Sequence, residues 1–199
     1  MSRHVPDQIV TDPQVALSYL KEGNQRFASG QLMPKDYYKE SLEIVKSGQK
    51  PFAGILTCSD SRTPPEIFFD QGIGNIFVCR NAGNFADDTA CGSLDFAAGV
   101  LGVKVIAVIG HNECGAVINA AKGTSGLPNE LQNILGQIQK NLKGVCDADK
   151  ADANKNGAAV KANVLASVER IKSLKMVKDK GVLVVGGHYD IGTGVVAWY

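Results

Sequence analysis

The fold is decided by residues 52–62, FAGILTCSDSR, in which an apolar run leads directly into a group of polar side chains. Residues 103–114, VKVIAVIGHNEC, repeat this order, with a strand expected at residues 103–109. Both apolar runs are typical of strands buried in a parallel sheet that is covered on both faces. Because open α/β sheets place their chemistry in loops that follow strands, we expect the two polar groups to form the functional site.

The rest of the chain alternates helix-like and strand-like segments, which predicts an α/β fold with a mainly parallel central β-sheet flanked by helices. Asp12 and Pro13 are typical of an N-cap and a first helical position. Further strands are expected at residues 75–79, 182–185 and 195–198, the last as an edge hairpin partner. Helices are expected at residues 13–27, 38–47, 65–69, 88–101, 114–122 and 129–142, and after a polar loop at residues 147–156.

Composition favours one ordinary globular domain spanning residues 1–199. The chain has 199 residues, 44% hydrophobic content, 21% charged content and a net charge of +1. This balance gives no electrostatic reason to expect nucleic acid or a membrane as partner. Residues 1–14 are too polar for a signal peptide, so we expect a cytoplasmic protein. In a reducing compartment, five cysteines are better explained by metal binding or burial than by disulfides.

Cys58, His111 and Cys114 are candidate metal ligands. Thiolate and imidazole suit zinc, and a tetrahedral ion held by three protein ligands keeps one position for chemistry. Asp60 has two possible duties: it could fill that fourth position, or it could pair with Arg62 and accept a hydrogen bond from metal-bound water. In the second arrangement zinc would lower the pKa of its water to about 7, so that hydroxide attacks a small electrophile.

Other interpretations stay open for several of these residues. Asp60 and Arg62 could be a plain surface ion pair, which is worth little. Cys79, Cys91 and Cys146 are expected to be small buried side chains without a function. Glycines after the apolar runs suggest dinucleotide binding only weakly, because no phosphate-binding pattern is complete.

The residues at the two strand ends resemble the zinc motif of β-class carbonic anhydrases. That motif is Cys-x-Asp-x-Arg at residues 58–62, followed by Gly-His-x-x-Cys-Gly at residues 110–115. Three further segments are similar to landmarks of the family, and they extend the resemblance over residues 13–197: Gly23–Phe27, Arg80–Asn84 and Tyr189–Gly194.

The resemblance implies a zinc enzyme, with one Zn²⁺ per chain, that interconverts carbon dioxide and bicarbonate. Cys58, His111 and Cys114 would bind the metal, and Asp60 with Arg62 would keep the fourth position open and orient zinc-bound hydroxide. The substrate-binding residues implied are Gln49, Phe77 and Phe96, and Gln49 and Phe77 match the plant-like subgroup. That subgroup has tyrosine where this chain has Phe96, so one hydroxyl is missing from the expected pocket. Gly115 is a further candidate, because amides at the start of a helix favour an anionic product.

The resemblance also implies a homodimer, or a dimer of dimers, in which pocket residues are shared across the interface. Residues 1–50 would then form an N-terminal helical arm with a projecting helix that packs on the neighbouring subunit. Relatives that hydrolyse carbonyl sulfide or carbon disulfide carry the same ligands, so they remain an alternative. A zinc-binding domain without catalysis is a second alternative, although it would not need the Asp60–Arg62 pair.

Overall fold

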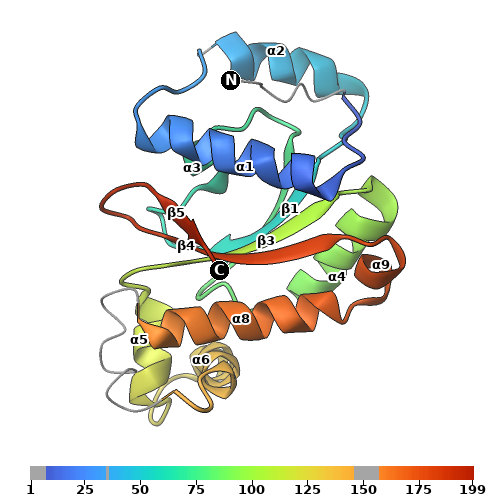
Figure 1. Ribbon diagram of the computed structural model, residues 1–199. Coiled ribbons are helices and arrows are strands. Elements are labelled where there is room, and N and C mark those ends of the chain that lie inside the picture. Colours follow the sequence, from blue (N-terminus) through green and yellow to red (C-terminus); the bar gives the residue numbers. More distant parts are fainter. Residues whose placement is uncertain (1–7, 35, 146–156) are drawn as a thin grey trace.

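The computed structural model describes residues 8–34, 36–145 and 157–199. Cys146 and the polar loop expected at residues 147–156 lie outside the described residues. Within the described ranges the chain forms one five-stranded sheet with helices on both faces (Figure 1). The α/β architecture expected from the sequence is therefore confirmed.

The sheet has the strand order β2-β1-β3-β4-β5. The first four strands of this order are parallel, and β5 pairs antiparallel with β4 as an edge hairpin partner. Strands β1 and β3 are buried along their whole length, as continuous apolar runs require. Their bounds are β1 Ala53–Cys58, β2 Ile76–Asn81, β3 Val105–His111, β4 Leu183–Tyr189 and β5 Val196–Trp198.

Helices cover the sheet in two layers (Figure 1). Helices α1, α2 and α3 lie on one side, whereas α4, α8 and α9 lie on the other, with α5 and α6 beyond the carboxyl ends of the strands. A π-helical turn, Ala97–Leu101, continues α4, and a 3₁₀ turn, Val45–Ser47, follows α2. The helices are α1 Pro13–Ala28, α2 Asp36–Ile44, α3 Pro65–Phe68, α4 Asp88–Phe96, α5 Gly115–Lys122, α6 Asn129–Asn141, α8 Ala158–Lys172 and α9 Lys175–Asp179.

Helix α1 begins where the sequence predicts, because the Asp12 side chain accepts a hydrogen bond from the Gln14 amide at 2.7 Å. The expected N-terminal helix is therefore present, and its apolar side packs on its own sheet. Ala16, Leu17 and Leu20 are buried in the cluster that covers one face of the sheet, together with side chains of β1 and β3. Burial of this apolar stripe stabilises the packing of α1 on the sheet.

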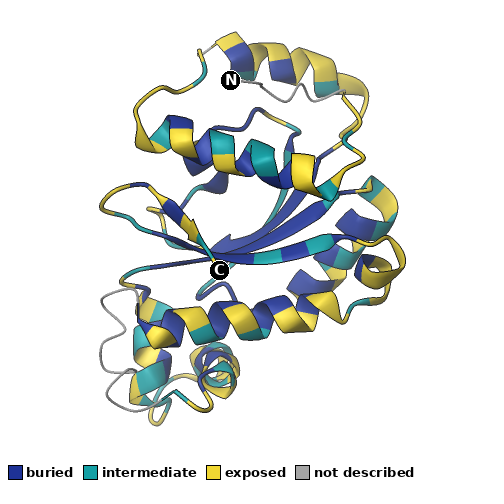
Figure 2. Ribbon diagram, viewed as in Figure 1, coloured by how far each residue is buried: buried dark blue, intermediate teal, exposed yellow. Residues whose placement is uncertain are grey.

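The second face of the sheet carries the larger apolar cluster, in which α4 and α8 pack on β1, β3 and β4. Helix α8 can approach closely because β3 has a glycine beneath it. A Cβ at Gly110 would lie 2.7 Å from Val164 and 2.8 Å from Val160. Figure 2 shows the central strands of the sheet mostly buried, whereas exposed residues recur along the helices.

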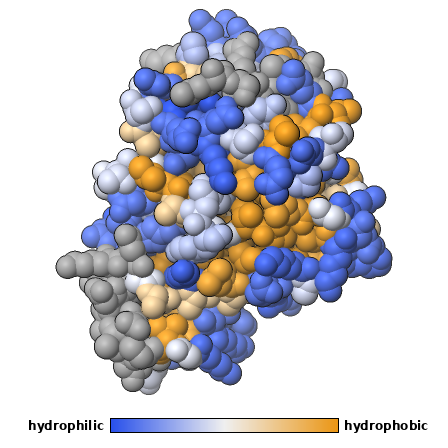
Figure 3. All heavy atoms as spheres, viewed as in Figure 1, coloured by the Kyte–Doolittle hydropathy of each residue, from blue (hydrophilic) through white to orange (hydrophobic). Residues whose placement is uncertain are grey.

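Coverage of the α1 face is incomplete. Figure 3 shows apolar side chains gathered between α1 and α8 on the viewed side, over the sheet. Leu183 and Val185 of β4 are only partly buried in the cluster beneath α1. Surface of this kind is typical of an interface with another protein chain.

Candidate metal centre

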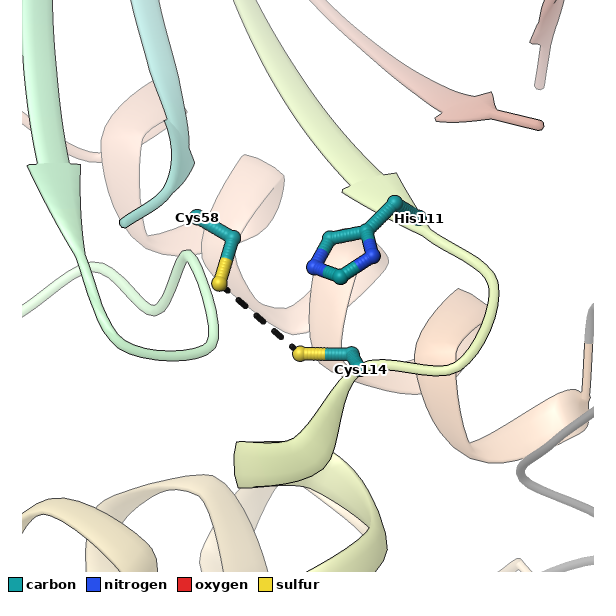
Figure 4. Close-up of side chains that lie close together, drawn as sticks. All are labelled: Cys58, His111 and Cys114. Atoms are coloured by element: carbon teal, nitrogen blue, oxygen red, sulfur yellow. Dashed lines mark hydrogen bonds between the residues drawn. The ribbon is translucent and has the colours of Figure 1, made fainter. Parts of the chain in front are cut away.

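The three predicted ligands meet at the carboxyl ends of two neighbouring strands (Figure 4). Cys58 is the last residue of β1, His111 is the last residue of β3, and Cys114 stands immediately before α5. Because β1 and β3 are parallel neighbours, their ends lie side by side. All three side chains are buried, and their ligand atoms lie within 4.8 Å of one another.

The geometry of this group fits a tetrahedral metal ion. The two sulfur atoms are 3.9 Å apart, and two Zn–S bonds of about 2.3 Å at the tetrahedral angle separate sulfurs by about 3.8 Å. His111 Nδ1 lies 2.8 Å from the carbonyl oxygen of Asn112, which fixes the proton on Nδ1. Its Nε2 is buried and has no hydrogen-bond partner among the described residues. A metal would satisfy this nitrogen.

Cys58 is prepared to act as a thiolate. The hydrogen bond with Cys114 and the Gly83 amide, 3.2 Å from the sulfur, are among the causes that together lower the pKa of the Cys58 thiol to about 4. The same sulfur–sulfur contact raises the pKa of Cys114, which is also buried. One proton is thus shared between the two sulfurs in the absence of metal, and metal binding would displace it.

Asp60 and Arg62 form a two-pronged ion pair beside the three ligands. Arg62 Nε donates to Asp60 Oδ1 at 3.0 Å, and Nη2 donates to Oδ2 at 2.8 Å. These hydrogen bonds lower the pKa of Asp60 to about 2. The carboxylate is outside the group of ligand atoms identified among the described residues. The structure therefore favours the paired arrangement of Asp60 over the ligating one.

The turn between Cys58 and Asp60 is held by residues that sequence reasoning did not assign to the site. Arg80 of β2 donates from Nε to the Cys58 carbonyl at 3.0 Å and from Nη2 to the Asp60 carbonyl at 2.7 Å. Thr63 Oγ1 donates to the Cys58 carbonyl at 3.2 Å. The only sequence signal for these hydrogen bonds was that Arg80 begins the segment Arg80–Asn84, which resembles a landmark of the family.

Glu113 lies at the rim of the site. Its carboxylate is 3.5 Å from Arg62 Nη1, and both side chains are about half exposed. Such a pair adds little stability. Its backbone has a φ of 56°, in the left-handed region, which turns the chain between His111 and Cys114.

Only one predicted substrate residue lies next to the metal group in the same chain. Gly115 directly follows Cys114 and is the first residue of α5, so it lies at a helix N-terminus beside the site. It is exposed to solvent.

The other three predicted substrate residues lie at the far end of the sheet. Phe77 is in register with Gly54, four residues before Cys58, which corresponds to about 13 Å along the strand. The ring of Phe96 contacts that of Phe77 in a tilted arrangement, with ring centroids 6.4 Å apart. Gln49 is exposed and precedes the amino end of β1. One chain therefore does not bring these residues to its own metal group.

Two buried polar side chains near the ligands have no protein partner in the described part of the chain. Both ring nitrogens of His188 and both amide atoms of Asn84 are unpaired. His188 is in register with Gly110, and a Cβ at Gly110 would lie 3.9 Å from Asn84 Nδ2. Burial lowers the pKa of His188, so it is neutral at pH 7.

Known proteins similar to this chain are carbonic anhydrases. A sequence profile described as carbonic anhydrase matches residues 53–196. Carbonic anhydrase 2 of Mycobacterium tuberculosis is 46% identical over 111 residues, which are 56% of this chain and 53% of that protein. The chain thus spans about half the length of the first curated relatives that it matches. No helix among the described residues is long and apolar enough to cross a membrane.

Solved structures give the same result over more of the chain. The β-carbonic anhydrase CafA of Aspergillus fumigatus superposes with a TM-score of 0.71 at 25% identity, covering 94% of this chain and 89% of that one. A Coccomyxa β-carbonic anhydrase in complex with acetazolamide also gives 0.71, at 26% identity, covering 92% and 85%. Two tetrameric β-carbonic anhydrases of Sordaria macrospora are represented by a chain with a TM-score of 0.70 at 22% identity.

Proposed function

Because this chain belongs to the carbonic anhydrase family, we propose that it catalyses the reversible hydration of carbon dioxide to bicarbonate and a proton. One observation carries the proposal. Three buried ligand atoms lie within 4.8 Å of one another, beside a carboxylate whose two oxygens are both held by Arg62. A purely structural metal site has no use for that ion pair.

Cys58, His111 and Cys114 would hold one zinc ion. Bound there, zinc would supply Lewis acidity, which lowers the pKa of a water molecule to about 7 and provides a nucleophile at neutral pH. The donor set suits this ion, since it combines two thiolates with a neutral imidazole whose free nitrogen faces the sulfurs.

Asp60 would orient the attacking water. Its carboxylate remains ionised at neutral pH, because the Arg62 hydrogen bonds hold its pKa at about 2, so it acts only as an acceptor. Among the described residues Oδ2 accepts the Arg62 Nη2 donor alone, and it would retain a lone pair for the water. Arg62 would keep the carboxylate turned away from the metal, and the Gly115 amide would favour the anionic product.

A second copy of the chain would complete the pocket. Phe77 and Phe96 lie at the outer strand β2 and the end of α4, where the exposed side chains include Ile73, Phe96 and Val100. Apolar surface at a sheet edge supports a homodimer. In such a dimer Gln49, Phe77 and Phe96 of one subunit would line the pocket of the other. Two such dimers would associate into a tetramer. The protein would act in the cytoplasm.

Stopped-flow measurement of carbon dioxide hydration tests this function on protein whose zinc content is measured in parallel. Cys58→Ser should lose both zinc and activity. Cys91→Ser is a matched control, because both side chains are 5% exposed but Cys91 lies in the α4 cluster away from the ligands. Cys91→Ser should keep both properties.

Two results would contradict the proposal. One is hydration that persists at full rate in zinc-free Cys58→Ser. The other is no hydration by wild-type protein that carries one zinc per chain. In the second case carbonyl sulfide and carbon disulfide are the next substrates to assay, and failure with these would leave a zinc-binding domain without catalysis.

A further inference from the structure

The Cys58 sulfur accepts a hydrogen bond from the main chain of a neighbouring loop. The Gly83 amide lies 3.2 Å from Cys58 Sγ. Gly83 has a φ of 88°, and a Cβ there would lie 2.4 Å from Ile138 of α6. The loop can therefore aim this amide at the sulfur only with glycine at position 83.

The carbonyl group of the same residue is held by helix α8. Asn163 Nδ2 donates to the Gly83 carbonyl at 2.7 Å. Asn163 Oδ1 in turn accepts from Asn141 Nδ2 of α6 at 2.9 Å. A continuous series of hydrogen bonds thus runs from α6, through α8 and Gly83, to a metal-ligating sulfur.

Helix α8 bears this polar group on a face that is otherwise apolar. Its buried side chains include Val160, Val164, Val168 and Ile171, and this stripe alone would suffice to pack the helix. Asn163 is fully buried and Ser167 is 1% exposed. Ser167, one turn after Asn163, accepts a hydrogen bond from the Ala86 amide at 3.2 Å, so both polar residues of the stripe bond the loop after β2.

We propose that Asn163 is a positioning residue for the metal centre, which holds Gly83 so that its amide stays directed at the Cys58 sulfur. An amide that donates to a metal-bound thiolate orients the ligand and disperses its charge, and removal of such an outer partner weakens metal binding about 10- to 100-fold. The inference rests on metal binding at the proposed centre and does not depend on the reaction catalysed there.

The test measures zinc affinity by competition with a chelator, in wild type, Asn163→Leu and Asn163→Asp. Val168→Ala serves as the control, because Val168 is a buried residue of α8 that packs in the sheet cluster. Both Asn163 variants should bind zinc about 10- to 100-fold more weakly than wild type. Val168→Ala should unfold more easily but bind zinc with unchanged affinity.

Replacing zinc with cobalt adds a spectroscopic measurement that would not change if Asn163 only stabilised the fold. The thiolate-to-cobalt charge-transfer absorption should shift in the Asn163 variants and stay unchanged in Val168→Ala, because only the former alter the hydrogen bond to sulfur. If Asn163→Leu fails to fold, Asn163→Asp decides the question at a pH at which its carboxyl group is ionised, because it then has the same shape without the donor. The inference would be overturned by a folded Asn163 variant that binds zinc as tightly as wild type and whose cobalt absorption is not shifted. If the wild-type chain itself bound no zinc, the proposed function would be refuted instead.

Discussion

A chain with Gln49→Ala should regain activity when it is paired with a chain that has no metal site. Gln49 is exposed and lies before the amino end of β1, whereas Cys58 ends that strand. Six strand residues span about 20 Å, so Gln49 is far from the metal group of its own chain. If Gln49 binds substrate, it must do so in another subunit.

The size of the effect follows from the hydrogen bond that Gln49 would supply. A hydrogen bond to a charged group contributes about 1.5–3 kcal/mol, so Gln49→Ala should lower kcat/KM about 10- to 150-fold. The side chain is exposed, so the substitution should leave the fold unaffected. Cys58→Ser should be inactive.

Co-expression of the two variants with different affinity tags, followed by purification on both tags, isolates the mixed dimer. Its Cys58→Ser subunit would supply an intact Gln49 to the intact metal site of its partner. One of two sites is then complete, so stopped-flow hydration should recover to about half of the wild-type rate. If Gln49 instead serves its own chain, neither site is complete. A mixed dimer no more active than the mean of its parents would refute the shared pocket.

Two further predictions concern buried polar groups. The buried Arg26 guanidinium pairs with Asp70, with 2.5 Å between Arg26 Nε and Asp70 Oδ2. Asp70→Asn should therefore lower the free energy of unfolding, measured in urea, by about 3–5 kcal/mol, because it leaves this buried charge without a counter-charge. Glu43→Gln breaks an exposed pair and should cost less than about 1 kcal/mol; equal losses in the two variants would show that burial is not the cause. The unpaired atoms of Asn84 and His188 should bind ordered water in a high-resolution crystal structure, and dry density around both side chains would contradict this.

The sequence predicted the parts of the site that depend on residue type and strand order. Continuous apolar runs indicated that β1 and β3 are parallel and buried, and parallel neighbours must end on the same edge of a sheet. Cys58 and His111, the residues that end these runs, were therefore placed together before any contact was known. The strand boundaries were less accurate: β3 begins at Val105 and includes His111, although residues 103–109 were expected. A hydrophobicity pattern cannot show that a polar residue at the end of a strand, such as His111, still belongs to the hydrogen-bonded ladder of the sheet.

The residues that hydrogen-bond to the ligands and to the turn after Cys58 could not be predicted, because residue type alone does not identify them. The donor from Gly83 is a main-chain amide, and every residue except proline has one. Asn163 interrupts an apolar stripe, but a single polar residue in a helix indicates only that it needs a partner, not which one. Arg80 lies on an edge strand, and its two carbonyl acceptors belong to a turn about 20 residues earlier whose shape depends on the fold.

The two cysteine ligands illustrate why burial alone could not separate a metal site from ordinary packing. Cys58 and Cys114 belong to the apolar cluster between α5, α6 and α8, alongside Leu135 and Ile138. Each sulfur packs there as a small hydrophobic group would. What distinguishes them from Cys91, which is equally buried, is His111 Nε2, a buried acceptor that no described residue satisfies. An apolar cluster that encloses an unpaired imidazole nitrogen beside two sulfurs is incomplete as a protein core, and a thiophilic metal ion would complete it.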